Sequence, residues 1–205
     1  MGASRKFHLR NGGLSMSANF PIFQHAYFVN DIEESVHKWH RLYGAGPFVL
    51  VPHHKTLKFQ YRGTRQEADV SYAFGYLGNN QIQFIQQHDD TPSIYRDMYS
   101  KGEEGFHHVG CLVNDFAAAR QRMNDLGFVN ACELWADDVN AAYFDTRSVN
   151  GGFTEIHGDP AHILATFAGW KRAHENMKPG DSPVMSRTAP FPDGRDPAYL
   201  DSFFK

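Results

Sequence analysis

An internal repeat constrains the fold of this chain more than any other feature of its sequence. The segment FQHAYFVNDIEESVHKWHRLYG at residues 23–44 resembles FHHVGCLVNDFAAARQRMNDLG at residues 106–127. In each copy a Phe lies two residues before a His, Val-Asn-Asp comes next, and a Gly lies 19 residues after the His. Val-Asn-Asp follows His25 one residue sooner than it follows His108. We expect the helix that comes next to absorb this difference of one residue. The repeat predicts two related structural units.

Each copy has the pattern of a strand followed by a helix. The residues after each His are rich in β-formers, and Asp31 and Asp115 are good N-caps for a helix that begins directly after them. Beyond each Asp the apolar residues recur at intervals of 3 and 4, which gives each helix one apolar face. Gly44 and Gly127 suit the helix ends.

Short apolar segments after each helix complete the two units. The strand candidates are 47–51, 57–61, 70–77 and 81–85 in the first unit, and 129–135, 140–145 and 152–157 in the second. Gly78-Asn79-Asn80 predicts a hairpin turn. Both units then share a β-α-β-β-β order, and neither can close its own sheet. We predict an α+β fold in which two paired βαβββ modules form one curved mixed sheet.

The same patterns predict three regions along the chain. Residues 1–20 are basic and lack periodicity, so we expect a disordered leader. Residues 21–160 should form the domain, with modules at 21–90 and 104–160 joined by a helix over 92–103. Residues 161–205 should form a terminal helix over 161–176 and an extended, proline-containing tail. We expect the tail aromatics to pack on their own or on a neighbouring subunit.

Composition excludes several classes of function. A net charge of -3 and a pI of about 6.4 offer no footprint for nucleic acid. No apolar run reaches the roughly 20 residues that span a bilayer, and no secretory signal begins the chain, so we expect a soluble, cytoplasmic protein. Cys111 and Cys132 are too few for a disulfide framework and are expected to be reduced core thiols.

Four residues that can bind metal fall at matching places in the two units. His25 and Gln83 lie on the first and last strands of the first unit, and His108 and Glu155 lie on those of the second. A single such residue is usually structural, but their recurrence favours a shared site. Imidazole, amide oxygen and carboxylate together suit one divalent transition-metal ion such as Zn²⁺, Mn²⁺, Fe²⁺, Co²⁺ or Ni²⁺.

The order His, Gln, His, Glu, with EGFHHVG, VSYAFGYLGNNQIQFI and GGFTEIHG, resembles the vicinal oxygen chelate superfamily of glyoxalases, bleomycin resistance proteins and dioxygenases. Within it, the methylmalonyl-CoA epimerase family is most similar. The resemblance covers about residues 21–158. It implies a cup-shaped, glyoxalase-like sheet around one metal ion, with His25, Gln83, His108 and Glu155 as ligands. His107 alternates to the other face of its strand and is not expected to bind.

Such a site predicts proton abstraction beside a chelated carbonyl, through an enolate. A substrate that binds the ion through two adjacent oxygens becomes more acidic at the neighbouring carbon. Glu155 is the leading candidate base, and Asp69, Tyr72 and Tyr143 are second-rank candidates. Some relatives carry a glutamate base on the strand that reads DVSYAFGYL here.

Aromatic residues are frequent on the predicted strands, which suits a small to medium, even aromatic, catabolite. We take Phe74, Phe106 and Trp135 as candidate substrate contacts, and Arg62 as a candidate partner for a substrate carboxylate or phosphate.

Three classes of function stay open at this stage. The first is a metal-dependent isomerase, epimerase or lyase. The second is an extradiol-type Fe²⁺ dioxygenase, which Gln83 as a fourth ligand disfavours, because oxygen activation needs open positions. The third is a non-catalytic small-molecule binding or resistance protein, which the full ligand set disfavours. In each case we expect a homodimer, because sheets of this type leave unpaired edges and an apolar outer face.

Overall fold

The two copies of the repeat fold alike in the computed structural model, which describes residues 20–54, 56–136 and 139–185. The predicted leader, up to residue 19, and the tail from residue 186 lie outside the described residues. In chain order the elements are β1 Ile22–Phe28, α1 Ile32–Tyr43, β2 Phe48–Val51, β3 Lys58–Tyr61, β4 Thr64–Arg65, β5 Val70–Leu77, β6 Asn80–Gln87, β7 Gly105–Val113, α2 Phe116–Asp125, β8 Asn130–Ala136, β9 Val139–Asp145, α3 Arg147–Asn150, β10 Phe153–Gly158, α4 Ala161–Glu175 and β11 Val184–Met185.

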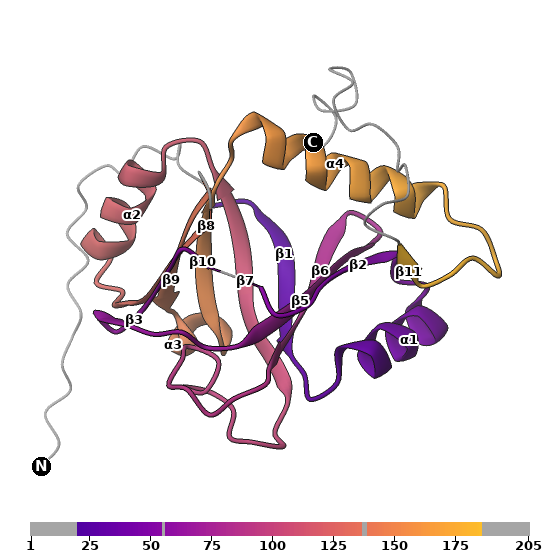
Figure 1. The fold of residues 1–205 in the computed structure, drawn as a ribbon. Helices are drawn as coiled ribbons and strands as arrows, with labels where there is room; N and C mark the ends of the chain where they lie inside the picture. Colours follow the sequence, from indigo (N-terminus) through magenta and orange to yellow (C-terminus); the bar gives the residue numbers. More distant parts are fainter. Residues whose placement is uncertain (1–19, 55, 137–138, 186–205) are drawn as a thin grey trace, which may run out of the picture.

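The strands form one mixed sheet that joins the two units. Its order is β11-β2-β5-β6-β1-β7-β10-β9-β8-β3-β4, and the sheet is not closed. Within each unit the first strand runs parallel to the last, as β1 with β6 and β7 with β10. Between the units, β1 and β7 pair antiparallel. The predicted α+β class and the single curved sheet are therefore confirmed (Figure 1).

The two repeat helices begin and end where the sequence predicts. Asp31 caps α1 by accepting a hydrogen bond from Glu34 N at 2.9 Å, and Asp115 caps α2 in the same way. Gly44 ends α1 in the left-handed region, at φ 73°. Helix α1 has 12 residues and α2 has 10. The two helices therefore differ in length only after their N-cap Asp residues. Val-Asn-Asp occupies the same place at the start of both helices.

A hairpin of the first unit completes the sheet of the second. Strand β3 leaves β2 and β5 and pairs instead with β8, and β4 pairs with β3 as the last strand at the far edge of the sheet. At the opposite edge, the short β11 pairs with β2. These additions satisfy edge strands that would otherwise present unpaired backbone groups. The predicted strand over 57–61 is confirmed, but its partner belongs to the other unit.

The predicted linking helix over 92–103 is wrong, because this segment forms turns. Ser93 accepts hydrogen bonds at its Oγ from the backbone N–H groups of Tyr95 and Arg96, at 3.1 Å each. Ile94 and Tyr95 are both fully buried. Adjacent core residues and a series of hydrogen-bonded turns replace the amphipathic helix. The predicted terminal helix is confirmed as α4.

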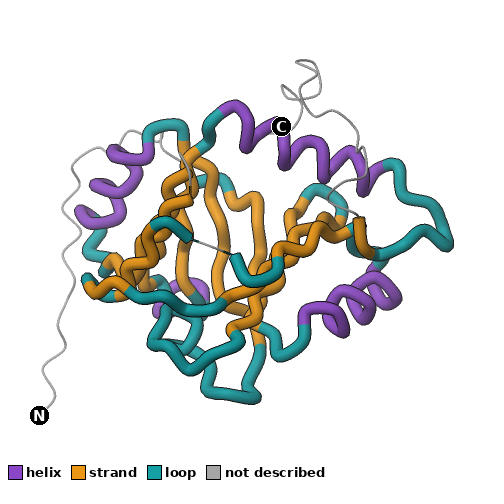
Figure 2. Tube along the Cα trace, viewed as in Figure 1, coloured by secondary structure: helices purple, strands orange, loops and turns teal. Residues whose placement is uncertain are grey.

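Helices cover both faces of the sheet. Helices α1 and α2 pack on the outer face, and α4 crosses the opposite, concave face (Figures 1 and 2). No helix of the described residues is long and apolar enough to cross a membrane. Cys111 and Cys132 are buried free thiols, as expected, and burial raises the pKa of Cys111 to about 12.

Candidate active site

The concave face of the sheet encloses a cavity of about 470 Å³. Its base is polar, with Gln24, Gln83, Tyr143 and Glu155 exposed to it. Its walls are mostly aliphatic and aromatic, and α4 contributes one side. A largely apolar chamber with a few convergent polar groups is the usual form of a small-molecule site.

The register of the central strands brings the polar groups together. On β1 and β7, Gln24 pairs with Gly110 and Ala26 pairs with His108. Gly110 also pairs with Glu155 on β10, while Ala26 also pairs with Gln83 on β6. Because paired residues share a face of the sheet, these four polar side chains surround two of its smallest residues.

The small residues at the centre leave room that a larger side chain would fill. A Cβ at Gly110 would lie 2.9 Å from Gln24 Oε1, closer than such atoms approach in proteins. Ala26 is fully buried beneath the same cluster. Gly110 therefore lets the Gln24 side chain lie close over the backbone of β7.

Three acceptor atoms in this space have no hydrogen-bond partner. They are Gln24 Oε1, Gln83 Oε1 and His108 Nε2, and they make up three of the five such buried atoms in the described part of the chain. An unsatisfied buried polar atom costs roughly 1–3 kcal/mol. A cation bound among them would satisfy such acceptors, so the chemistry of these residues fits a metal ion.

Glu155 adds a carboxylate to this cluster. Its Oε2 lies 3.2 Å from His108 Nε2, although the two atoms do not have the geometry of a hydrogen bond. Two atoms at this separation could both bind one ion at the usual bond lengths of about 2.0–2.2 Å.

The tautomer of His108 is set by its neighbours. His107 Nε2 lies 3.2 Å from the carbonyl oxygen of Ile94, which can only accept, so His107 carries its proton on Nε2. Burial lowers the pKa of His107 well below its usual value, so its ring is neutral and its Nδ1 is an acceptor. The contact of 2.9 Å between the two Nδ1 atoms is then a hydrogen bond donated by His108. His108 Nε2 therefore presents a lone pair to the cluster.

The amide of Gln24 is oriented in a similar way. Its Nε2 donates to Gln81 Oε1 at 2.5 Å, and Gln81 Nε2 lies 3.4 Å from the hydroxyl of Tyr76. Because the nitrogen of the Gln24 amide is engaged, its oxygen is the atom left for the cluster.

The structure places His25, a predicted metal ligand, on the opposite face of β1 from the cluster. His25 pairs with Ile82 and Val109, whereas the cluster lies on the alternate residues of β1, β6 and β7. Ile82 belongs to the apolar core beneath α1, on the outer face. Aligning the copies at His25 and His108 shifted the strand by one residue. Counted from the N-cap Asp, the equivalent of His108 is Gln24, seven residues before Asp31.

Glu155 is held as a carboxylate at the base of the cavity. The hydroxyl of Tyr143 donates to its Oε1 at 2.9 Å. Burial opposes ionisation of Glu155, while the hydrogen bond from Tyr143 favours its carboxylate form. Burial also raises the pKa of Tyr143 well above its usual value, so its hydroxyl stays a donor.

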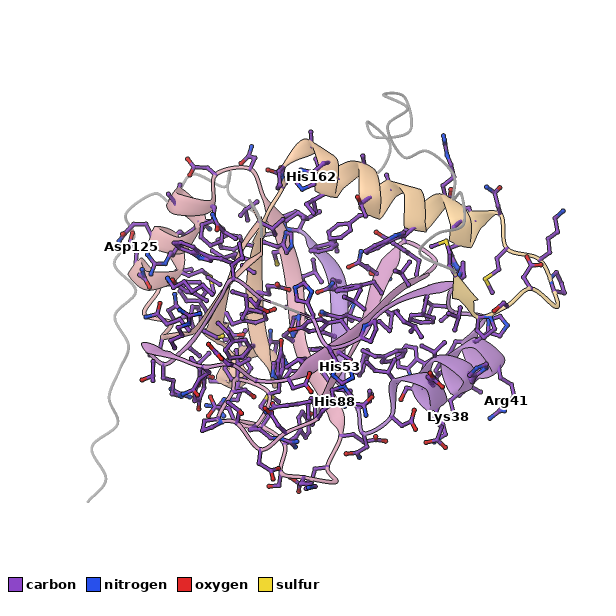
Figure 3. All side chains as sticks on the ribbon, in the orientation of Figure 1. Lys38, Arg41, His53, His88, Asp125 and His162 are labelled. Atoms are coloured by element: carbon purple, nitrogen blue, oxygen red, sulfur yellow. The ribbon has the colours of Figure 1, made fainter. Side chains whose placement is uncertain are left out.

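The other two candidate bases lie in different surroundings. Tyr72 lines the cavity, but its hydroxyl bonds to that of Tyr95 at 2.9 Å, and burial raises its pKa. Asp69 does not line the cavity; its carboxylate accepts a hydrogen bond from His53 Nδ1 at 2.8 Å. His53 lies at the end of the sheet remote from His162 on α4 (Figure 3). Asp69 is therefore unsuited to act on a ligand in the cavity.

Only one of the four predicted substrate contacts lines the cavity. Phe74 does so, and its ring stacks on Trp170 of α4 at 5.4 Å. Phe106 contacts Tyr27 on the outer face, and Trp135 is 43% exposed with Lys58 over its ring. Arg62 forms an ion pair with Asp97 at 2.6 Å. Trp135 alternates away from Leu134, which lines the cavity, whereas Phe106 pairs with Tyr27 beyond a register shift between β1 and β7; residue type alone reveals neither.

Reasoning from sequence missed several residues of this site. His157 lines the cavity two residues after Glu155, on the same face of β10. Its Nδ1 donates to Gly158 O at 2.6 Å, so Nε2 is unprotonated in the neutral ring. The sequence GGFTEIHG contained this signal, because residues two apart on a strand, such as Glu155 and His157, share a face. No sequence pattern indicated that α4 lines the cavity.

Comparison with known proteins agrees with the fold. Residues 23–148 match the Glyoxalase/Bleomycin resistance protein/Dioxygenase superfamily. The chain belongs to this superfamily. Methylmalonyl-CoA epimerase from Mycobacterium tuberculosis has a similar structure, with a TM-score of 0.52 and 15% identity, over 74% of this chain and 96% of its own. A hypothetical protein from Bacillus halodurans C-125 gives a TM-score of 0.47 and 17% identity, over 68% and 94%. No curated protein matches the sequence.

The superfamily and its epimerase-type neighbours correspond to the resemblance predicted from the sequence motifs. At this level of identity the similarity shows the glyoxalase-like fold. The chemistry of the site has to be argued from the residues of this chain.

Proposed function

We propose that this chain is a metal-dependent isomerase, epimerase or lyase that removes a proton from the carbon beside a carbonyl group. The observation that supports the proposal is the cluster of three unsatisfied acceptor atoms beside a buried carboxylate, at the base of an apolar cavity. A substrate with two adjacent oxygens would place them at this cluster.

Gln24, Gln83, His108 and Glu155 would hold the ion. Three oxygen donors and one nitrogen donor form a harder set than the predicted pair of His residues, and they favour Mn²⁺ among the transition metals considered. When bound there, a divalent ion acts as a Lewis acid that stabilises negative charge on a substrate oxygen.

The residues around the ion would supply metal binding, proton transfer and the exclusion of water. Glu155 accepts a hydrogen bond at Oε1 and places Oε2 3.2 Å from His108 Nε2, so we assign it as a ligand rather than as the base. His157 offers an unprotonated Nε2 on the same face, so we assign the proton transfer to His157. The hydroxyl of Tyr143 holds Glu155 in place. The apolar walls exclude water from the reacting carbon.

The ligand set argues against an extradiol-type dioxygenase. Non-haem Fe²⁺ oxygenases use two His residues and one carboxylate with open positions. In the described cluster His108 alone contributes an imidazole nitrogen, since His107 is turned to Ile94 O and His25 lies on the other face.

Metal binding by matched variants tests the proposal. Titration with Mn²⁺ should show about one ion per chain, and chelation should lower the melting temperature, because a ligand at 100 times its dissociation constant adds about 2.7 kcal/mol. Gln24→Leu and His108→Ala should lose the ion. His25→Ala, which changes the next residue on the same strand, is the control and should keep it. Retention by Gln24→Leu together with loss by His25→Ala would overturn the proposed ligand set.

We also propose that the chain forms a homodimer. Leu42 and Tyr43 on α1, Leu126 after α2 and Val149 on α3 are all at least half exposed. Covering apolar side chains of this kind stabilises association.

A further inference from the structure

Helix α4 contributes to the cavity although it lies beyond the residues that match the superfamily. The match ends at residue 148, and α4 spans Ala161–Glu175. Five residues of α4 line the cavity: His162, Ile163, Thr166, Phe167 and Trp170. The helix crosses the concave side of the sheet from the end of β10 toward β2 and β11 (Figure 1).

Ring contacts and backbone hydrogen bonds hold α4 in this position. Trp170 stacks on Phe74 at 5.4 Å, and Phe167 stacks on Phe23 at 5.6 Å. Near the end of the helix, His174 Nδ1 donates to Gly46 O at 2.5 Å, and its Nε2 accepts from Gly78 N at 3.0 Å. The helix is therefore packed against the sheet over its length and fixes the shape of the cavity.

The cavity that α4 completes has His54, His157 and His162 as its potentially cationic lining residues. Among the described residues that line it there is no Lys or Arg, and Glu155 is the one carboxylate. A phosphate group needs Arg, Lys or a series of backbone N–H donors, and an unpaired buried charge is costly. A substrate with a phosphate-bearing coenzyme handle is poorly matched to these walls.

We propose that α4 is the specificity element of this site, and that it selects a compact substrate with an uncharged aromatic or alicyclic ring and a head of two adjacent oxygens. The ring would lie against Trp170 and Phe167, with its oxygens toward Gln24 and Glu155. The cavity of about 470 Å³ lies in the lower half of the usual range for small-molecule sites, about 300–1,000 Å³. The identity of the head rests on the proposed function, whereas the ring preference rests on α4.

The proposal can be tested by calorimetry on the Mn²⁺-loaded full-length protein. The three ligands differ in whether they carry the ring, the head or the coenzyme handle. Phenylpyruvate has the ring and the head, pyruvate has the head alone, and propionyl-CoA has the coenzyme handle. Phenylpyruvate should bind about tenfold or more tightly than pyruvate, because aromatic contacts and ring burial add to the shared head. Propionyl-CoA should bind more weakly than phenylpyruvate. Equal binding of phenylpyruvate and pyruvate, or tighter binding of propionyl-CoA, would overturn the proposal.

Variants then assign the ring preference to α4. Trp170→Leu should weaken phenylpyruvate binding about tenfold and leave pyruvate binding unchanged. Trp135→Leu makes the same change on the outer face and should alter neither. Thr166→Phe fills the cavity without removing a ring contact, and it should block phenylpyruvate even if Trp170→Leu fails to fold. Unchanged phenylpyruvate binding by Thr166→Phe would contradict the role of α4.

A ligand without the head separates this inference from the proposed function. Indole has a ring but no adjacent oxygens, and it should bind to chelator-treated protein and be weakened by Trp170→Leu. If it does so while no ligand exchanges a proton, the ring preference stands and the proposed chemistry fails. If pyruvate exchanges its proton but indole does not bind, the chemistry stands and the role of α4 fails.

Discussion

At the scale of single residues, the site depends on which atoms of a side chain are already engaged. Gln24 and His108 each use one polar atom in a neighbouring hydrogen bond and present the other to the cluster. Second hydrogen bonds of this kind orient metal ligands and tune their affinity. His107 therefore matters to the site without facing it.

The variant His107→Phe tests this positioning role. It keeps a ring in the core but removes the acceptor for His108 Nδ1–H, so the affinity for Mn²⁺ should fall by about 10- to 100-fold. His107→Asn, which offers an amide oxygen in place of Nδ1, should retain most of the affinity. Nitrogen NMR of the metal-free protein should show His108 protonated on Nδ1 in the wild type. A proton on Nε2 there would contradict the assignment.

Glu155 and His157 should respond differently to substitution. His157→Gln should keep the metal while exchange of the acidic proton of pyruvate with solvent deuterium falls by about 10²–10⁴-fold, the usual contribution of a general base. Glu155→Gln should weaken metal binding first, because it removes the charge of a ligand. If Glu155→Gln instead kept the metal and lost exchange, Glu155 would be the base, as the sequence had indicated. Exchange is measured by mass spectrometry at matched metal content.

At the scale of elements, α4 is joined to the sheet by a histidine that bonds to two backbone groups. His174 contacts Gly46 O and Gly78 N, which lie in the loops before β2 and after β5. The helix thus depends on loops of the first unit, although it comes after the second unit in the chain.

His174→Ala should loosen the end of α4. Loss of the two hydrogen bonds should reduce the free energy of unfolding by roughly 1–3 kcal/mol and raise the rate of amide hydrogen exchange in α4. Lys171→Ala, which removes an ion pair with Glu175 within the same helix, is the control and should have a smaller effect. Equal rates of amide hydrogen exchange in α4 for both variants would mean that stacking by Phe167 and Trp170 is sufficient to hold the helix on the sheet.

At the scale of the whole molecule, one sheet serves two units and leaves its outer helices partly apolar. Leu42 is 71% exposed on α1 and Val149 is 72% exposed on α3. Sedimentation at tens of micromolar should show a dimer. Leu42→Glu should shift the protein toward monomer if α1 lies at the interface, and Val149→Glu should do so if α3 lies there. A monomer for the wild type would contradict the proposed homodimer.

Local signals in the sequence were sufficient for most elements. The N-cap residues Asp31 and Asp115, the stop at Gly44 and the apolar periodicities predicted α1 and α2 closely, because capping and amphipathic packing are set by nearby residues. The repeat also predicted the joining of both units in one sheet, since neither copy can pair its own edges.

Tertiary structure decided which residues face one another. A shift of one residue reverses the face of every side chain on a strand, so the choice between His25 and Gln24 depended on the pairing of β1 with β6 and β7. The crossing of β3 to β8 and the docking of α4 over the cavity join segments far apart in the chain. Sequence alone determined the units and three of the four residues in the cluster, Gln83, His108 and Glu155. Long-range pairing supplied the fourth, Gln24, and the wall of the chamber, because strand register and helix docking are set by contacts that no local pattern encodes.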